Sequence, residues 1–398
     1  MRAATVLFGA FDRHNFGDLL FPHIVSALLP GHDLVFAGLA ERDLRPYGGH
    51  TVHALHRLAR EGRLRGASLV HVGGEILSCS ARQAAVMLLP NEEVDATLGY
   101  IEQHPGEEPH WLGTLLGTAS PMPYVASRDE LPGVGRFVFN AVGGVALPAL
   151  PPPWRQAVLA RLAAADAVGV RDVVTLASLQ SAGIAASLMP DPSVMVDTLF
   201  GPTIRARAGQ GPVAEVRAAF PGGYVAMQLA ADFGDDATLA TIGTQLEATA
   251  ADTGLGIVLF RAGAAPCHDA LGVLARIAQR MATGSRVRLF ESLDLWDICA
   301  LLAHASAHAG SSLHGHIVAT AFGVPAVGLQ RPHDPAQAGK LAAYLTTWEA
   351  PQDAVLWPAG RLAEGIRTAL AGDAAQRQAR RAQWVASYRS SFEQLMRC

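Results

Sequence analysis

The sequence predicts an α/β protein with two domains, each built around a parallel sheet. The chain has 398 residues, which is more than a single hydrophobic core usually supports. Short apolar runs alternate with helical patterns, and no hairpin signal separates them, as is typical of parallel sheets. Gly, Pro and Arg interrupt this alternation between Phe200 and Pro221, and it restarts at residue 223. We therefore expect domains at 1–200 and 223–350, a linker at 201–222 and a helical segment at 351–398.

The first half alternates strands and helices up to a Pro-rich segment near residue 190. Strands are predicted at residues 5–10, 34–39, 68–77, 137–144, 167–172 and from 187 onward, and helices at 19–29, 50–63, 82–89, 153–165 and 173–182. Residues 90–134 show no clean period and contain many Pro, Gly, Glu and His residues. We expect them to form a mostly irregular insertion, which could cover a binding site.

The second half repeats the pattern more regularly. Strands are predicted at 224–229, 256–260, 287–290, around 309–311 and at 326–329, and helices at 236–253, 269–281, 295–305, after residue 312 and at 378–396. The last helix can cross back to the first domain.

Charge and cysteine usage exclude several classes of protein. The net charge is −4 and the pI is about 6.4, so no basic field indicates nucleic acid or an anionic membrane as a partner. The N-terminal apolar run is too short for a signal peptide, and no apolar run is long enough to span a bilayer. Four scattered cysteines without metal-type spacing indicate reduced thiols in the cytoplasm. We expect a cytoplasmic protein with at most peripheral membrane contact and no metal, and a homo-oligomer is among the states that the sequence allows.

The stretch Ala309–Leu329 contains the densest group of chemically active side chains. A short strand leads into Ser311, Ser312, His314, Gly315 and His316 at the start of a helix. In an open parallel sheet this turn lies at the carboxyl end of a strand, where helix N–H groups can hold an anion. The hydroxyls of the two serines and the N–H groups of Gly315 and His316 are candidates for that role. Alternatively, the serines only cap the helix and the histidines are solvated.

Three further strand ends carry polar residues or glycines. Asn15-Phe16-Gly17-Asp18 follows the first strand, and Gly73-Gly74-Glu75 follows the third. Arg171-Asp172 and Asp191-Pro192 end two later strands. Helix capping explains Asn15 and Asp18 equally well, and Arg171 could simply pair with Asp172 or Asp191.

Taken in order, these motifs resemble the polysaccharide pyruvyl transferase family. That family typically shows Asn-x-Gly-Asp, a glycine run, Arg-Asp, Asp-Pro, and Ser-x-Arg-x-His-Gly followed by an apolar helix and Gly-x-Pro. Gly323-Val324-Pro325 matches the last of these. Two positions depart from the pattern: Glu75 takes the third place of the glycine run, and Ser312 takes the place of the arginine.

The resemblance implies a GT-B-like fold, with two Rossmann-like domains facing a cleft. It also implies a bacterial enzyme of exopolysaccharide or cell-envelope biosynthesis, which transfers a pyruvyl group from phosphoenolpyruvate to a hydroxyl pair on a glycan. The first domain would lie on the acceptor side and the second on the donor side. No cofactor is implied. By family position, His314 is the acid that protonates the donor, since an imidazole has a suitable pKa.

Because Ser312 removes a charge, another cation has to hold the anionic donor. Arg171 and Arg261 are the candidates, with Ser311, Ser312, Gly315 and His316 as further donor-binding residues. Alternatively the donor is a nucleotide-sugar, with His314 as acid/base and Glu291 or Asp18 as its partner. A third possibility is a family member that binds a glycan precursor or partner without turnover. The residues expected at the acceptor or in the cleft are Asn15, Gly17, Asp18, Gly73, Gly74, Glu75, Asp191 and Glu291. Nothing in the sequence identifies the acceptor.

Overall fold

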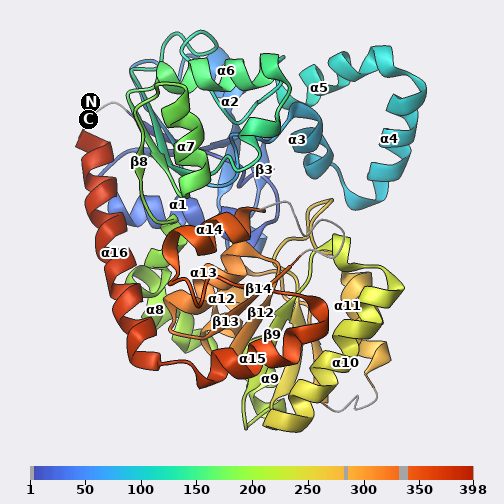
Figure 1. Cartoon of the computed structure of the whole chain (residues 1–398). Helices are drawn as coiled ribbons and strands as arrows, with labels where there is room; N and C mark the ends of the chain where they lie inside the picture. The colour runs from blue at the N-terminus through green and yellow to red at the C-terminus, as the bar shows by residue number, and fades with distance from the viewer. Residues whose placement is uncertain (1–3, 282–285, 331–338, 398) are drawn as a thin grey trace. The chain divides into compact units, whose positions relative to one another are not determined.

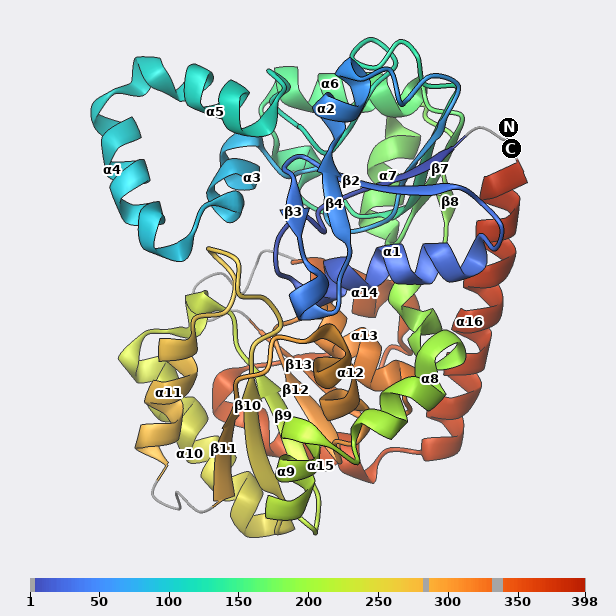
Figure 2. The same cartoon turned by 180° about the vertical axis from the view of Figure 1, so that it is seen from behind.

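The computed structural model describes residues 4–281, 286–330 and 339–397. It confirms the α/β class, with one parallel sheet in each of two compact units. The first unit comprises Met1–Pro192 and Ser387–Cys398, and the second Ser193–Ala386. Figures 1 and 2 show the chain from two opposite sides.

The first unit is built on an eight-stranded sheet in the order β3-β4-β2-β1-β5-β6-β7-β8. All neighbouring strands are parallel except β3 and β4, which are antiparallel. The central strands β1, β5 and β6 are almost wholly buried and mostly apolar, as expected for a parallel sheet that is covered on both faces. The strands are β1 Thr5–Phe8, β2 Leu34–Gly38, β3 Arg42–Asp43, β4 Thr51–Ala54, β5 Ser68–His71, β6 Arg136–Val142, β7 Ala167–Val170 and β8 Ser187–Leu188. The helices are α1 Phe16–Leu28, α2 Leu55–Arg60, α3 Ala81–Leu88, α4 Val94–Gln103, α5 Glu108–Leu116, α6 Pro152–Ala163 and α7 Val173–Ser181.

The predicted helix at 50–63 is wrong in its first part, which forms strand β4. Val52 is fully buried and pairs with Arg42 of β3, while His53 pairs with Ala37 of β2. These two strand partners satisfy the backbone of residues 51–54, so the helix starts only at Leu55.

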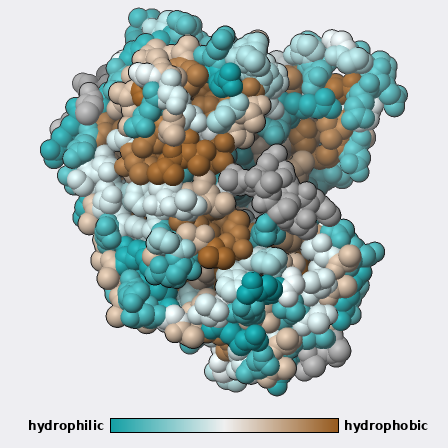
Figure 3. All heavy atoms as spheres, in the orientation of Figure 1, coloured by the Kyte–Doolittle hydropathy of each residue, from teal (hydrophilic) through white to brown (hydrophobic). Residues whose placement is uncertain are grey.

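The predicted irregular insertion at 90–134 is also wrong in part, because it contains α4 and α5. The prolines that suggested loop structure lie at helix starts: Pro109 is in the first turn of α5, and Pro105 opens a 3₁₀ turn before it. Proline is tolerated there because the first N–H groups of a helix have no intrahelical partner. Helices α3, α4 and α5 form an arm that projects from the first unit (Figures 1 and 2). Its outer side is hydrophilic, and hydrophobic atoms show on its inner side (Figure 3).

The second unit contains a six-stranded parallel sheet in the order β11-β10-β9-β12-β13-β14. Its strands are β9 Tyr224–Gln228, β10 Gly256–Phe260, β11 Val287–Phe290, β12 Ala307–Gly310, β13 Ala326–Leu329 and β14 Leu356–Trp357. Its helices are α8 Val196–Arg207, α9 Gly211–Ala219, α10 Asp236–Thr253, α11 Leu271–Arg280, α12 Leu295–Ala303, α13 Leu313–Ala321, α14 Lys340–Trp348, α15 Leu362–Ala371 and most of α16 Ala374–Arg397. Strand β14 corrects the expectation that 351–398 is entirely helical.

The predicted linker at 201–222 is helical rather than irregular. Helix α8 includes Gly201 and Pro202, the residues that suggested a break, and Ile204 is fully buried. Arg207 of α8 binds Asp297 of α12 at 2.8 Å. A Cβ on Gly201 would displace the Asp197 carboxylate, which pairs with Arg205. The two units therefore separate at residues 192 and 193.

The C-terminal end of α16 packs into the first unit. The Tyr388 hydroxyl hydrogen-bonds the Asn140 side chain, and both residues are fully buried. Arg136 donates to the carbonyl oxygens of Leu395 and Met396 at 2.8 and 2.7 Å. Across the described residues, no helix combines the length and apolarity that crossing a bilayer requires.

Candidate functional site

The turn after β12 is built by its own side chains and by Gln228, the last residue of β9. Ser312 caps α13, and its Oγ accepts a hydrogen bond from the Gly315 N–H at 3.1 Å. The Gln228 Oε1 accepts from the backbone N–H groups of Ser311 and Ser312 at 3.1 and 2.8 Å. The capping alternative for Ser312 is therefore what the structure shows.

The amides expected to hold an anion are largely used within this turn. The Gly315 N–H donates to Ser312 Oγ, and the His316 N–H donates to the Ser312 carbonyl at 3.1 Å. The N–H of Leu313 has no hydrogen-bond partner among the described residues. An anion at this helix start would therefore meet the amide of Leu313.

The two histidines of α13 lie in different surroundings. They are two positions apart, so their side chains leave the helix about 200° apart. His316 Nε2 lies 3.4 Å from Glu349 Oε1, and Glu349 also pairs with Arg380. The His316 side chain thus contacts Glu349 rather than the turn. His314 is buried, with 5% of its surface exposed.

Asp269 is connected to the turn through Gln228. Sequence reasoning did not select it as a site residue. Its Oδ1 accepts from Gln228 Nε2 at 2.9 Å, and its Oδ2 accepts from the Ala262 N–H at 2.6 Å. Burial raises the pKa of the Asp269 carboxyl to about 7, against the opposing effect of these hydrogen bonds and of the Lys340 charge. Lys340, the only lysine in the chain, therefore lies within electrostatic reach of this group.

Arg261 follows β10 and is half-buried. Its guanidinium has no hydrogen bond or ion pair with any residue of the described ranges, and its Nε is buried. Strand β9 lies between β10 and β12, so the backbone at Arg261 is about 10 Å from the Ser311 turn, given strand spacings of about 4.8 Å. A small anion that carries two or three polyatomic groups could span the separation between Arg261 and the Ser311 turn.

Glu291 does not join this group. It is exposed and follows β11, which is separated from β12 by β10 and β9. Three strand spacings amount to about 14 Å, too far for the expected partnership with His314.

In the first unit, the polar residues after β1 form a connected group. Asn15 caps α1, and its Oδ1 accepts from the N–H groups of Gly17 and Asp18 at 3.1 and 3.4 Å. Arg13 lies 3.9 Å from the Asp18 carboxylate and donates to the Tyr124 hydroxyl at 2.6 Å. Sequence reasoning missed Arg13 and Tyr124, because only the fold brings the loop before Tyr124 to this strand end.

Arg171 connects three strand ends of the first unit. It is 1% exposed, and its guanidinium binds Asp191 at 2.9 Å and Glu75 at 3.0 Å. These two carboxylates raise the pKa of Arg171, although burial opposes them. The charge of Arg171 is therefore already matched, as in the pairing alternative.

The backbone around this ion pair is unusual. Ala141 has a φ of 49°, and the β6–β7 register shifts between Phe139 and Val142. A Cβ on Gly143 would collide with Glu75 and Arg171. Strain and bulges at strand ends often mark functional sites.

The glycine turn after β5 lies beside this group. Gly73 and Gly74 have φ values of 131° and 91°, which favour glycine, and a Cβ on Gly74 would lie 3.3 Å from Asp18 Oδ1. Of the residues expected on the acceptor side, those after β1 and β5 thus lie at neighbouring strand ends, and Asp191 after β8 is joined to them through Arg171. No group of three or more His, Cys, Asp or Glu residues within the described ranges could hold a metal ion.

Comparisons with known proteins bear on the family and on the fold. The family model described as "Polysaccharide pyruvyl transferase" matches residues 150–333, a segment that includes Arg171, Asp191, Arg261 and the turn from Ser311 to His316. A search of curated proteins finds no match.

Three solved structures share the fold over nearly the whole chain. UDP-N-acetylglucosamine 2-epimerase from Rickettsia bellii has 9% identity and a TM-score of 0.59, over 99% of this chain and 96% of that one. UDP-GlcNAc 2-epimerase from Neisseria meningitidis, bound to UDP-GlcNAc, has 12% identity and a TM-score of 0.54, over 99% and 100%. Trehalose 6-phosphate synthase from Burkholderia multivorans has 14% identity and a TM-score of 0.51, over 99% and 97%. At these identities the likeness concerns the fold alone. The chain has a GT-B-like fold, and the expected resemblance to the polysaccharide pyruvyl transferase family is confirmed over residues 150–333.

Proposed function

We propose that this protein is a transferase that moves a pyruvyl group from phosphoenolpyruvate to a pair of hydroxyls on a sugar of a glycan or glycan precursor. The observation that supports this most is the family match over residues 150–333, because it includes Arg171 and Asp191 of the first unit and the Ser311–His316 turn of the second. No cofactor is needed, since phosphoenolpyruvate is itself the activated donor.

The donor's negative charge is best assigned to Arg261 and Lys340, with the Leu313 N–H at the helix start. Arg261 lacks a carboxylate partner among the described residues, whereas Arg171 already binds two. Lys340 is close enough to lower the pKa of Asp269. Arginine suits a carboxylate or phosphate because it can donate two parallel hydrogen bonds. These residues would supply the positive charge that the family's arginine provides at the position of Ser312.

His314 is proposed as the acid. Its proton would pass to the methylene carbon of the donor, which makes the neighbouring carbon electrophilic. One sugar hydroxyl then adds to that carbon, and the second displaces phosphate to close the ketal. Of the two hydroxyl protons, one restores the acid and one leaves with phosphate, so the reaction balances.

The acceptor is proposed to bind at the strand ends of the first unit. Asp18 and Glu75 offer carboxylate oxygens as hydrogen-bond acceptors for sugar hydroxyls, and the glycine turn at Gly73 and Gly74 lets a ligand approach the backbone.

A nucleotide-sugar donor is the second candidate. The Neisseria meningitidis 2-epimerase that shares the fold is bound to UDP-GlcNAc, and a helix start suits a diphosphate. This candidate predicts binding of UDP-GlcNAc or UDP rather than phosphoenolpyruvate.

Thermal-shift titration of the wild type with phosphoenolpyruvate, UDP-GlcNAc and UDP separates the candidates. A ligand at a hundredfold its Kd adds about 2.7 kcal/mol of stability. We expect a shift with phosphoenolpyruvate only. A shift with UDP-GlcNAc alone would replace the donor assignment, and no shift with any of the three would contradict a donor site of either kind.

Arg261→Gln should weaken phosphoenolpyruvate binding about 10- to 100-fold, the effect of losing one charged hydrogen bond of roughly 1.5–3 kcal/mol. Arg288→Gln is the matched control, because Arg288 is exposed on the adjacent strand β11 and donates to the Glu215 carbonyl. Equal affinities for the two variants would remove Arg261 from the site.

A further inference from the structure

Asp269 and Gln228 together link three neighbouring strand ends of the second unit. It binds the loop after β10 through the Ala262 N–H and the end of β9 through Gln228. Gln228 in turn binds the two amides after β12. The strand order β10-β9-β12 makes these ends neighbours. The loop held by Ala262 begins with Arg261, so both parts of the proposed donor site depend on one carboxylate.

Each hydrogen bond in this chain has a fixed donor and a fixed acceptor. Among the described residues, every group that bonds to the Asp269 carboxylate is a donor: Gln228 Nε2, the Ala262 N–H and the backbone of Gly263. Because the Gln228 NH₂ points at Asp269, its Oε1 points at Ser311 and Ser312. An acceptor at position 269 therefore fixes the orientation of Gln228.

We propose that Asp269 is a positioning residue of the donor site, which orients the Ser311–Ser312 turn through Gln228 and holds the Arg261 loop through Ala262. The inference rests on the proposed function for the identity of the donor, but not for the hydrogen-bond chain itself.

This arrangement makes the site sensitive to pH. The Asp269 pKa of about 7 means that the carboxyl gains a proton on mild acidification. The added O–H would face donors, so one of the three hydrogen bonds has to break. The charged group that reaches Asp269 is Lys340 of α14, and His268 is its neighbour in sequence. Donor affinity should fall as the pH drops below about 7.

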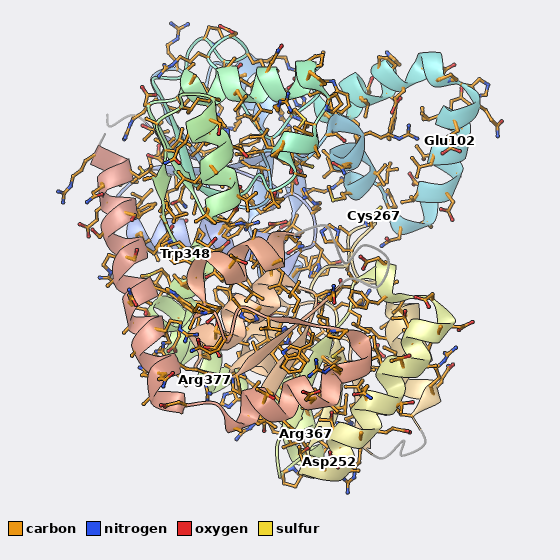
Figure 4. The ribbon with its side chains drawn as sticks, in the orientation of Figure 1. Glu102, Asp252, Cys267, Trp348, Arg367 and Arg377 are labelled. Atoms are coloured by element: carbon orange, nitrogen blue, oxygen red, sulfur yellow. The ribbon has the colours of Figure 1, made fainter. Side chains whose placement is uncertain are left out.

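Asp269→Asn is the informative variant. An asparagine can satisfy the Ala262 N–H only by turning its NH₂ toward Gln228. Gln228 would then have to flip and present its own NH₂ to the amides of Ser311 and Ser312, which breaks the turn. Asp252→Asn is the matched control, because Asp252 is exposed and pairs with Arg367 on the surface (Figure 4).

The first measurement monitors the loop around Asp269 in the absence of phosphoenolpyruvate. Cys267 (Figure 4) is exposed and lies two residues before Asp269, and the described cysteines Cys79 and Cys299 are buried. A trifluoroethyl group on Cys267 in a Cys398→Ser background reports by fluorine NMR. We expect a titration with a midpoint near pH 7 in the wild type and in Asp252→Asn, and its loss in Asp269→Asn. The same titration in Asp269→Asn would assign it to His268 and overturn the proposal.

The second measurement is the Kd for phosphoenolpyruvate. At pH 8 we expect Asp269→Asn to bind about tenfold more weakly than the wild type. At pH 6 the ratio of the two Kd values should approach 1, which a merely structural defect would not produce. A ratio that stays constant with pH contradicts the proposal. If the wild type binds no phosphoenolpyruvate, the proposed function fails, and the fluorine titration still decides the role of Asp269.

Discussion

Arg171 is buried between Glu75 and Asp191, so its removal would leave two carboxylates without their cation. Breaking a buried ion pair typically costs 3–5 kcal/mol. We expect Arg171→Met to lower the free energy of unfolding of the first unit by about that amount, measured by urea denaturation.

The control is Arg367→Met, which removes an exposed pair with Asp252 (Figure 4). Exposed pairs contribute about 0–1 kcal/mol, so this variant should stay close to the wild type. If Arg171→Met were as stable as Arg367→Met, the ion pair would not connect the strand ends as described.

Sequence motifs located individual residues but not the partners that these residues bind. The motif around Arg171 indicated a charged strand end, and Asp191 was among its possible partners. Gln228 and Asp269, however, stand 41 residues apart and outside every motif, and Tyr124 reaches Asp12 across 112 residues. Local patterns do not show such pairs, because the fold creates them.

Helix α13 is the element on which the donor site depends most, and its cap is Ser312. Restoring the family's arginine by Ser312→Arg should have two opposite effects. Loss of the cap should cost about 1 kcal/mol of stability, while the added charge should tighten phosphoenolpyruvate binding. Urea denaturation and thermal-shift titration measure the two effects separately.

Ser312→Ala is the control for this experiment, because it removes the cap without adding charge. We expect both variants to lose similar stability and only Ser312→Arg to gain affinity. Equal affinities would mean that position 312 does not face the donor.

Elements were predictable where the hydrophobic period was strong and failed where local signals competed. Helix α10 and strands β9 and β10 coincide closely with the predicted ranges. Residues 51–54 carry a pattern that fits a helix, and pairing with β2 and β3 makes them a strand. In α5, a proline that resembles a loop signal in the sequence starts the helix instead.

Over the whole chain, the restart of the strand–helix alternation correctly indicated two parallel sheets. The boundary was less predictable, because Gly201 and Pro202 resemble a linker although they lie inside a helix. No sequence pattern indicated that the loop after β10 and the end of β9 both donate hydrogen bonds to the Asp269 carboxylate.

The stability of the whole protein should fall on acidification because of buried neutral histidines. His71 in the first unit and His308 in the second are completely buried. Burial lowers the pKa of each from 6.5 to about 3. Between these values the unfolded chain binds protons that the folded chain does not. Each histidine then removes up to about 1.4 kcal/mol per pH unit below 6.5. Asp269, with its raised pKa, acts in the opposite direction and offsets part of this loss.

His71→Gln tests this prediction, because glutamine can donate to Val138 and accept from Ala126, as His71 does, but cannot take up a proton. Urea denaturation at pH 7, 6 and 5 measures the slope of stability against pH. We expect the variant to be less stable at pH 7, since it loses the ring stacked on Phe139, but to have a shallower slope by about one histidine's share. An unchanged slope would show that His71 takes up its proton in the folded state, which burial should prevent.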